Sequence, residues 1–272
     1  MNRSYAEAEA HVFRACGLFP AVHPLSLARP HLQTRVVEVD AGEPAVFLHG
    51  FSLCTAHWAP LVSRLTGVRS LMLDAPGHGA AEAVNYRGVD LRGWFKEMLT
   101  ACLEGLEEVR LIGHSQGAML ALWLALDAPK RVRSVVSIGT PAVAFGARLD
   151  AMRVLARPGV GRLLLSFPWP PPAYRSILAG TMGRAAVRAH PDLVRATYLA
   201  HPPRGIREDH LKLLTRDVPR GGRRSAPICA VGCRAAAHHA ASTGALGPRR
   251  HTVPTDRRGE SQGGADPARP LC

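Results

Sequence analysis

Aromatic residues are scarce in this 272-residue chain, and long apolar runs are absent from it. The absence of long apolar runs argues against a membrane-spanning protein. Only 6% of the residues are aromatic, although 47% are apolar, a share that is ordinary for a globular protein. No apolar run reaches the roughly 20 residues that span a bilayer. Residues 1–10 lack the basic flank and apolar stretch of a secretory signal. We therefore expect a cytoplasmic protein with no membrane span.

Lysine is also scarce, and this bears on the net charge of +13. Only three of the 34 basic residues are lysines, at positions 96, 130 and 212. So strong a preference for arginine indicates a GC-rich coding sequence more than a phosphate-binding surface. Residues 219–272 alone hold nine arginines against three acidic residues, and no basic stripe interleaved with aromatic residues remains elsewhere. We expect no nucleic-acid partner.

The six cysteines have no repeated spacing that would indicate a metal site. Cys229 and Cys233 lack the second pair of ligands that a structural zinc ion needs. Free thiols in a reducing compartment are the simplest interpretation. The sequence implies no metal and no organic cofactor, and it does not indicate the oligomeric state.

The chain divides into four regions of different texture. Residues 1–35 combine a helical start with a proline-containing loop, and residues 36–141 alternate short apolar strands with helices, which is typical of a parallel α/β sheet. Residues 142–217 are helical and punctuated by proline, and residues 218–272 have no aromatic residue and few large apolar ones, so we expect a disordered tail. Strands are predicted at 36–39, 45–48, 69–73, 109–112 and 135–138, and helices at 56–65, 91–106, 118–126, 149–165 and 175–199.

A serine between two glycines carries the strongest chemical signal. Residues 113–117 read GHSQG, which fits the G-x-S-x-G pattern, with an apolar strand before it and a helix after it. Small flanking residues allow a serine to sit on a sharp turn, and the following helix directs its N–H groups and positive dipole end there. Ser115 is therefore the candidate nucleophile, the alternative being an ordinary serine-containing turn.

A second backbone donor for an oxyanion is expected directly after the strand that ends at Leu48. Three motifs follow in order: LHGF at 48–51, DAPGHG at 74–79 and GHSQG at 113–117. In them the chain resembles the α/β-hydrolase family across residues 36–217. The resemblance implies a mostly parallel α/β sheet with a helical lid inserted after Ile138. It also implies an oxyanion hole made by the backbone N–H groups of Phe51 and Gln116. By the same resemblance, His49, Asp74 and His78 hold the turns together without taking part in the chemistry. His114, inside the elbow, is expected to be a packing residue and not a base.

The C-terminal part departs from the family pattern and is expected to be incomplete. Residues 226–232 resemble the family strand that precedes the catalytic acid, but CRAA follows at 233–236 where an aspartate is expected. No Gly-His pair follows. His251 lies nearest the expected distance and is the candidate base, while Asp256 comes in the wrong order for the acid. The acid therefore stays unassigned.

Three explanations for this departure stay open. A shifted reading frame near residues 219–233 would produce the abrupt change to an Arg-, Gly-, Pro- and Ala-rich tail, and the composition favours it. The chain could instead be a degenerate hydrolase, or the acid could come from Asp150 or Asp209. Without the final strand and helix of the family, an open strand edge and exposed apolar surface predict poor solubility for the chain as written.

These features together predict a serine hydrolase that cleaves a small apolar carboxylic ester, or a related acyl substrate, through an acyl-serine intermediate. Phe167, Trp169 and Tyr174 in the lid region favour an apolar substrate. The elbows of haloalkane dehalogenases and epoxide hydrolases carry aspartate at the position of Ser115, which argues against both activities. The alternative is a non-catalytic pseudoenzyme, or a truncated hydrolase without the acid and histidine.

Overall fold

The computed structural model describes residues 3–28, 31–82, 91–139, 160, 163 and 169–200. All of them belong to the first of two compact units, residues 1–233, whereas the second unit comprises residues 234–272. His251, Asp256, the expected strand at 226–232 and the whole tail from residue 218 lie outside the described residues. So do residues 201–217 and most of the expected helix at 149–165.

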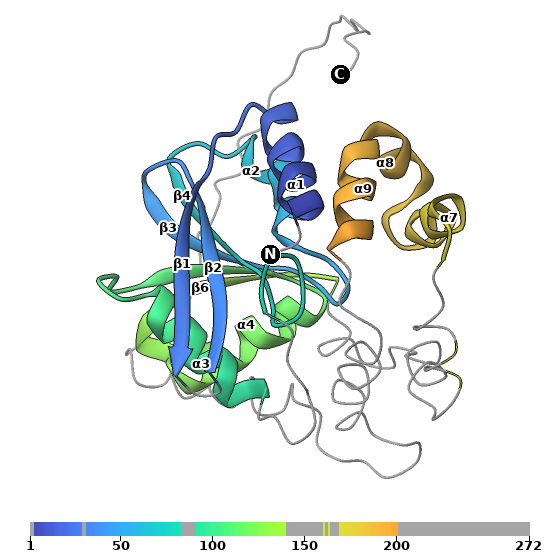
Figure 1. Cartoon of the computed structure of the whole chain (residues 1–272). Coiled ribbons are helices and arrows are strands. Elements are labelled where there is room, and N and C mark those ends of the chain that lie inside the picture. The colour runs from blue at the N-terminus through green and yellow to red at the C-terminus, as the bar shows by residue number, and fades with distance from the viewer. Residues whose placement is uncertain are drawn as a thin grey trace, which may run out of the picture. The chain divides into compact units, whose positions relative to one another are not determined.

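The described core is a six-stranded, mostly parallel sheet, as the sequence predicts (Figure 1). The strand order is β1-β2-β4-β3-β5-β6. β4, β3, β5 and β6 run parallel to one another, while β2 pairs antiparallel with both β1 and β4. The strands span Ala21–Ala28, His31–Val39, Glu43–Leu48, Val68–Leu73, Val109–His114 and Val132–Ile138, from β1 to β6.

The expectation of a loop within residues 1–35 is wrong for β1. Ala21–Ala28 forms a strand that pairs along its whole length with β2, and Pro24 lies opposite Arg35. Among the described strands β1 has only this one neighbour, and a proline that donates no hydrogen bond is tolerated on such an edge. Proline content alone therefore gave a misleading indication here.

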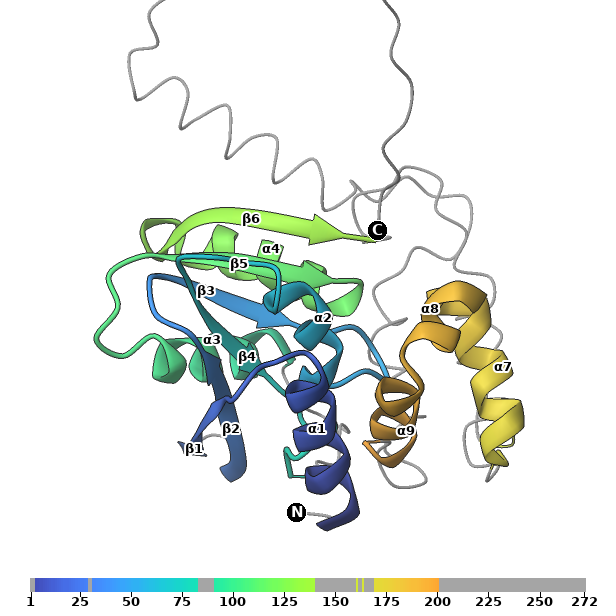
Figure 2. The ribbon, with the colours of Figure 1, turned by 90° about the horizontal axis from the view of Figure 1, so that it is seen from above.

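Helices cover both faces of the sheet (Figure 2). On one face, α3 (Leu91–Cys102) and α4 (Gln116–Asp127) pack over an apolar cluster that includes Val46, Leu111 and Met98. The opposite face is covered by α1 (Arg3–Ala15), the 3-10 helix η1 (Thr55–Trp58), α2 (Ala59–Val62) and α9 (Pro191–Leu199). Burial of these side chains from water is the main force that holds the layers together.

The helices after β6 are only partly described. α7 (Pro171–Met182) and α8 (Arg184–Ala189) form a small cluster of their own around Tyr174 and Leu178, and α9 follows them. α9 also contributes Leu193 and Ala196 to the larger core cluster beneath α1. A pair of exposed side chains, His11 on α1 and Asp192 on α9, approach to 3.3 Å. α9 is therefore packed on the core of the molecule.

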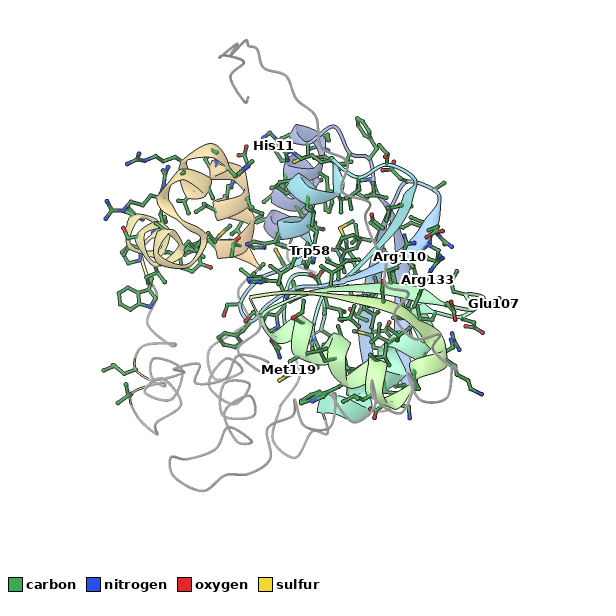
Figure 3. The ribbon with its side chains drawn as sticks, turned by 180° about the vertical axis from the view of Figure 1, so that it is seen from behind. His11, Trp58, Glu107, Arg110, Met119 and Arg133 are labelled. Carbon is green, nitrogen blue, oxygen red and sulfur yellow. The ribbon has the colours of Figure 1, made fainter. Side chains whose placement is uncertain are left out.

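Figure 3 shows the side chains of the described residues, seen from behind the view of Figure 1. Trp58 is buried and meets Phe47 edge to face, with ring centroids 5.3 Å apart. Arg110 and Arg133 lie together at one end of the sheet, where both pair with Glu43. Because Glu43, Arg110 and Arg133 belong to β3, β5 and β6, these pairs link the amino-terminal halves of three parallel strands.

The part of the chain that the structure describes contains no helix long and apolar enough to cross a membrane.

β6 is the least covered strand. It has β5 as its one neighbour among the described strands, and the 3-10 helix η2 (Pro129–Arg131) precedes it. Val136 and Ile138 are 49% and 39% exposed, high values for large apolar residues in a strand. The expected exposure of apolar surface at this edge is present for these residues.

Candidate active site

Ser115 lies between β5 and α4 in a backbone conformation that a serine seldom adopts. Its φ is 51° and its ψ is −113°, so the residue is one of three described non-glycine residues with positive φ. Conformations of this kind cost about 1–3 kcal/mol and persist where the surroundings enforce them. The Ser115 N–H donates to the carbonyl oxygen of Ile138 at 2.8 Å, and its own carbonyl accepts from Ala118 and Met119. The end of β6 and the first turn of α4 therefore fix the serine.

Close packing of α4 against the end of β3 explains the glycine after Gln116. A Cβ atom on Gly117 would overlap the carbonyl of Leu48 and come within 2.7 Å of the His49 carbonyl oxygen. Only glycine allows the first turn of α4 to approach the backbone of β3 this closely. The first N–H groups of α4, including that of Gln116, belong to the same end of the sheet as the residues after β3.

The turn after β3, residues 49–54, is called the β3 turn below, and it lies against Ser115. A Cβ atom on Gly50 would come 3.2 Å from the Cβ atom of Ser115 and 2.7 Å from Nδ1 of His114. Phe51 follows Gly50 directly and is partly exposed, with its ring 6.1 Å from that of His78. The structure therefore brings Ser115, Gln116 and the β3 turn with Phe51 to one end of the sheet.

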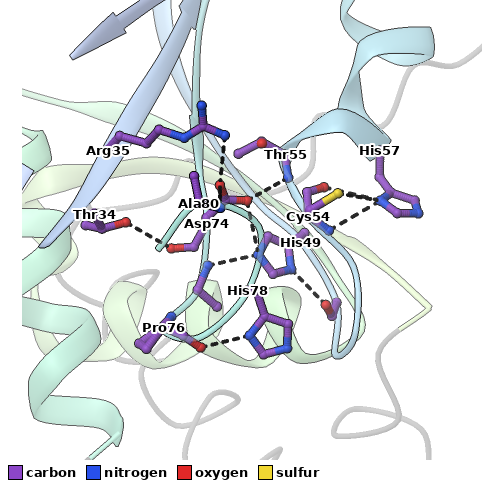
Figure 4. Close-up of polar contacts among 12 residues, drawn as sticks. Thr34, Arg35, His49, Cys54, Thr55, His57, Asp74, Pro76, His78 and Ala80 are labelled. Carbon is purple, nitrogen blue, oxygen red and sulfur yellow. Dashed lines mark hydrogen bonds and ion pairs between the residues drawn. The ribbon is translucent and has the colours of Figure 1, made fainter. Parts of the chain in front are cut away.

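Two buried histidines connect the β3 turn to the turn after β4, residues 74–80, called the β4 turn below (Figure 4). Nε2 of His49 accepts the N–H of Ala75 at 2.9 Å, so its proton lies on Nδ1, which donates to the Gly50 carbonyl. Nε2 of His78 accepts the N–H of Ser52, and its Nδ1 donates to the Pro76 carbonyl. Burial lowers the pKa of His49 against the opposing influence of Asp74. Both rings thus form hydrogen bonds with backbone groups of the two turns. This is the role in holding the turns together that the resemblance implied.

Asp74 is the anchor of the β4 turn. Its fully buried carboxylate accepts the N–H of Thr55 at 2.9 Å and that of Ala80 at 3.1 Å. Arg35 donates to the same carboxylate at 3.2 Å and also to Glu9 on α1. Sequence reasoning missed Glu9 and Arg35, which lie far from the three motifs. The one available signal was Glu9 itself, an acidic residue at helical spacing from the apolar Tyr5, Val12 and Phe13.

His57, at the end of η1, is a further residue that the sequence did not single out. Its Nδ1 accepts the N–H of Cys54 at 3.3 Å. Thr197 on α9 donates its hydroxyl to the Leu193 carbonyl, so Nε2–H of His57 donates to Thr197 Oγ1 at 3.1 Å. Burial, followed by the influence of His49, lowers the pKa of His57 to about 3. The neutral ring joins the end of the β3 turn to α9.

The hydrogen bonds of these histidines leave their ring nitrogens occupied, which argues against a role for them as the base. His49 and His78 use both ring nitrogens to bind the two turns, and His57 uses its own on Cys54 and on Thr197 of α9. The ring of His114 lies against Gly50 and Gly139, and burial lowers its pKa. The candidate base His251 lies outside the described residues, and the acid stays unassigned.

Across residues 3–28, 31–82, 91–139 and 169–200, no group of three or more His, Cys, Asp or Glu residues could hold a metal ion.

Comparison with known proteins agrees with this geometry. Residues 44–159 match the family model described as the alpha/beta hydrolase fold. A bifunctional epoxide hydrolase 2 from Sus scrofa is 29% identical over 137 residues, which cover 49% of this chain and 25% of that protein. A triacylglycerol lipase from Burkholderia plantarii is 32% identical over 136 residues, which cover 47% of this chain and 36% of the lipase.

A likeness to a solved structure extends over more of the chain. The crystal structure of a carboxylesterase from Bacillus subtilis matches with a TM-score of 0.51 and 18% identity, covering 75% of this chain and 69% of the carboxylesterase. The two curated relatives are matched over only 25% and 36% of their own lengths, so their activities belong to longer proteins. The match over residues 44–159, the likeness to the solved structure and the sheet topology agree, and the chain has the α/β-hydrolase fold.

Proposed function

We propose that the protein is a serine hydrolase that cleaves a small apolar carboxylic ester, with Ser115 as the nucleophile. The observation that carries the proposal is the positive φ of Ser115 at the junction of β5 and α4, directly against Gly50. Strain of this kind at a cost of about 1–3 kcal/mol is a feature of functional sites. The names of the lipase and the carboxylesterase among the similar proteins support an ester as the substrate class.

In the proposed reaction Ser115 Oγ attacks the ester carbonyl carbon and its proton passes to a base. The tetrahedral oxyanion accepts hydrogen bonds from the backbone N–H groups of Phe51 and Gln116. The C–O bond to the alcohol then breaks, the base returns the proton to the leaving alcohol, and an acyl-serine remains. A water molecule, deprotonated by the same base, attacks the acyl carbon. The bond from this carbon to Ser115 Oγ then breaks, the base returns the proton to Oγ, and the carboxylic acid leaves. His251 is the proposed base, and the helices after β6 are the proposed lid.

The α4 helix supports the oxyanion step in physical terms. Ser115 is its N-cap residue, so the first N–H groups of the helix and the positive end of its dipole lie beside the reacting oxygen. Removal of one such donor costs about 10²–10³ in kcat in enzymes of this kind. No cofactor and no metal take part in the proposed reaction.

The test is covalent labelling of the full chain with a fluorophosphonate, followed by mass spectrometry of the adduct. We expect a single adduct on Ser115, retained in a Ser63→Ala variant of an exposed serine and lost in Ser115→Ala. Hydrolysis of p-nitrophenyl butyrate should fall by a factor of about 10⁶ in Ser115→Ala if a complete triad operates. Equal labelling of the wild type and Ser115→Ala, or no labelling of either, would overturn the proposal and favour a non-catalytic protein.

A further inference from the structure

Three buried charged residues from distant parts of the chain meet beside the β3 turn (Figure 4). Glu9 comes from α1, Arg35 from β2 and Asp74 from the β4 turn, and they are 5%, 8% and 0% exposed. Arg35 Nη2 bridges Glu9 Oε2 and Asp74 Oδ2. Glu9 and Arg35 precede residues 44–159, the part of the chain that matches the family model. Two of the three charged residues therefore lie outside the three motifs, and only Asp74 belongs to one of them.

The cluster holds one residue at two points. The Thr55 N–H donates to Asp74 Oδ1 at 2.9 Å, and the Thr55 hydroxyl donates to Glu9 Oε1 at 2.5 Å. The Tyr5 hydroxyl donates to the same Glu9 oxygen at 2.8 Å. Thr55 comes directly after the β3 turn and is the first residue of η1. Gly50, at the other end of this turn, is held by His49 and touches Ser115.

A gain in stability does not explain why two carboxylates, those of Glu9 and Asp74, are buried beside Arg35. One carboxylate would neutralise Arg35, whereas the second adds a buried negative charge. Burial and then the charge of Asp74 raise the pKa of Glu9, although Arg35 acts against this rise. Buried ion networks of this kind contribute little net stability, because desolvation offsets the attraction, and they are retained in some proteins because they specify one geometry.

We infer that Glu9 is a positioning residue for the proposed oxyanion hole, because its bonds to Thr55 and Arg35 fix the β3 turn, which contains Phe51. The inference rests on the proposed function, since the position of the Phe51 amide matters for rate only if that amide binds the oxyanion. Glu9 does not touch the reacting atoms. It acts through Thr55 on one side and through Arg35 and Asp74 on the other.

The test compares Glu9→Gln with Glu7→Gln, an exposed acid on the same helix, in the full chain. With p-nitrophenyl butyrate as the substrate, we expect kcat to fall at least tenfold in Glu9→Gln while KM stays within a factor of two. Hydrogen exchange of the amides of residues 50–57 should become at least tenfold faster, while exchange in β5 stays unchanged. Glu7→Gln should match the wild type in both measurements. A uniform rise in exchange across the molecule, or unchanged exchange in residues 50–57, would overturn the inference.

A second variant keeps the test decisive if Glu9→Gln does not fold. Thr55→Val removes the hydroxyl bonded to Glu9 and leaves the three charges and the Thr55 N–H in place, whereas Thr55→Ser keeps the hydroxyl. We expect Thr55→Val to show the losses described for Glu9→Gln and Thr55→Ser to recover most of them. Equal behaviour of Thr55→Val and Thr55→Ser would contradict the inference. If wild-type protein neither labels nor hydrolyses ester, the proposed function fails, and the exchange of residues 50–57 alone decides whether Glu9 positions the turn.

Discussion

Gly50 lies directly against Ser115, so that a Cβ atom at position 50 would come within 3.2 Å of the Cβ atom of the serine. The same atom would come within 2.7 Å of Nδ1 of His114, closer than real Cβ atoms approach. The absence of a side chain at residue 50 is therefore what lets the β3 turn close against the elbow.

Replacement of Gly50 by alanine should push the β3 turn away from Ser115. We expect kcat for p-nitrophenyl butyrate to fall by about 10²-fold with little change in KM, because the Phe51 N–H no longer reaches the oxyanion. The matched control is Gly180→Ala, on α7, where an added Cβ meets nothing within 4 Å. Steady-state kinetics of both variants check this, and an equal loss in the two would contradict it.

The strained backbone of Ser115 should lower the free energy of unfolding by an amount that can be measured. Ser115→Gly and Ser115→Ala both remove the hydroxyl, but only glycine adopts a φ of 51° without a steric cost. After allowance for the greater freedom of glycine in the unfolded chain, we expect Ser115→Gly to be more stable than Ser115→Ala by about 1 kcal/mol. Urea denaturation of the two variants gives the difference. A more stable alanine variant would show that the elbow is not strained.

The neutral ring of His57 predicts a loss of stability in acid. Burial lowers the pKa of this histidine from its ordinary value of 6.5 to about 3. At a pH between these two values the unfolded chain binds one more proton than the folded protein, so the free energy of unfolding is greatest above pH 6.5 and falls as the pH is lowered. The slope that His57 adds is about 1.4 kcal/mol per pH unit.

Denaturation of the wild type and of His57→Gln between pH 7 and pH 4 tests this expectation. The free energy of unfolding of the variant should vary less steeply with pH than that of the wild type. The variant should also be less stable at pH 7, because it loses the bonds to Cys54 and Thr197. Parallel curves for the two proteins would show that His57 does not carry the acid sensitivity.

The exposed strand β6 predicts an aggregation surface. Val136 is 49% exposed in a strand with one described neighbour, and unprotected edges of this kind promote association between molecules. We expect Val136→Lys to raise the soluble fraction and to suppress concentration-dependent light scattering. Leu61→Lys, on α2 and 38% exposed, adds the same charge elsewhere. An equal gain in both variants would attribute the effect to net charge.

Local patterns in the sequence predicted most of the sheet but not the cluster around Glu9. The strands around residues 45–48, 69–73 and 109–112 are short apolar runs between turns, and their order along the chain is enough to indicate parallel pairing. β1 was missed because Pro24 argues against a strand unless the strand lies at an edge, which only the tertiary structure reveals. Contacts between residues 9, 35 and 74 likewise depend on the way the chain folds back on itself. His251 could be proposed as the base only from its distance along the chain, because neither an aspartate nor a Gly-His pair follows residues 226–232 where the family pattern has them.

The position of α1 has a consequence for the way the protein is made. α1 leaves the ribosome well before part of its covering, because Leu193 and Ala196 on α9 come about 180 residues later along the chain. At about 5–20 residues per second, this interval lasts roughly 10 to 40 s. For that time the apolar side of α1 that α9 covers in the finished protein stays open to solvent or to a chaperone. Nascent chains of this protein should therefore depend on early protection of their first 15 residues.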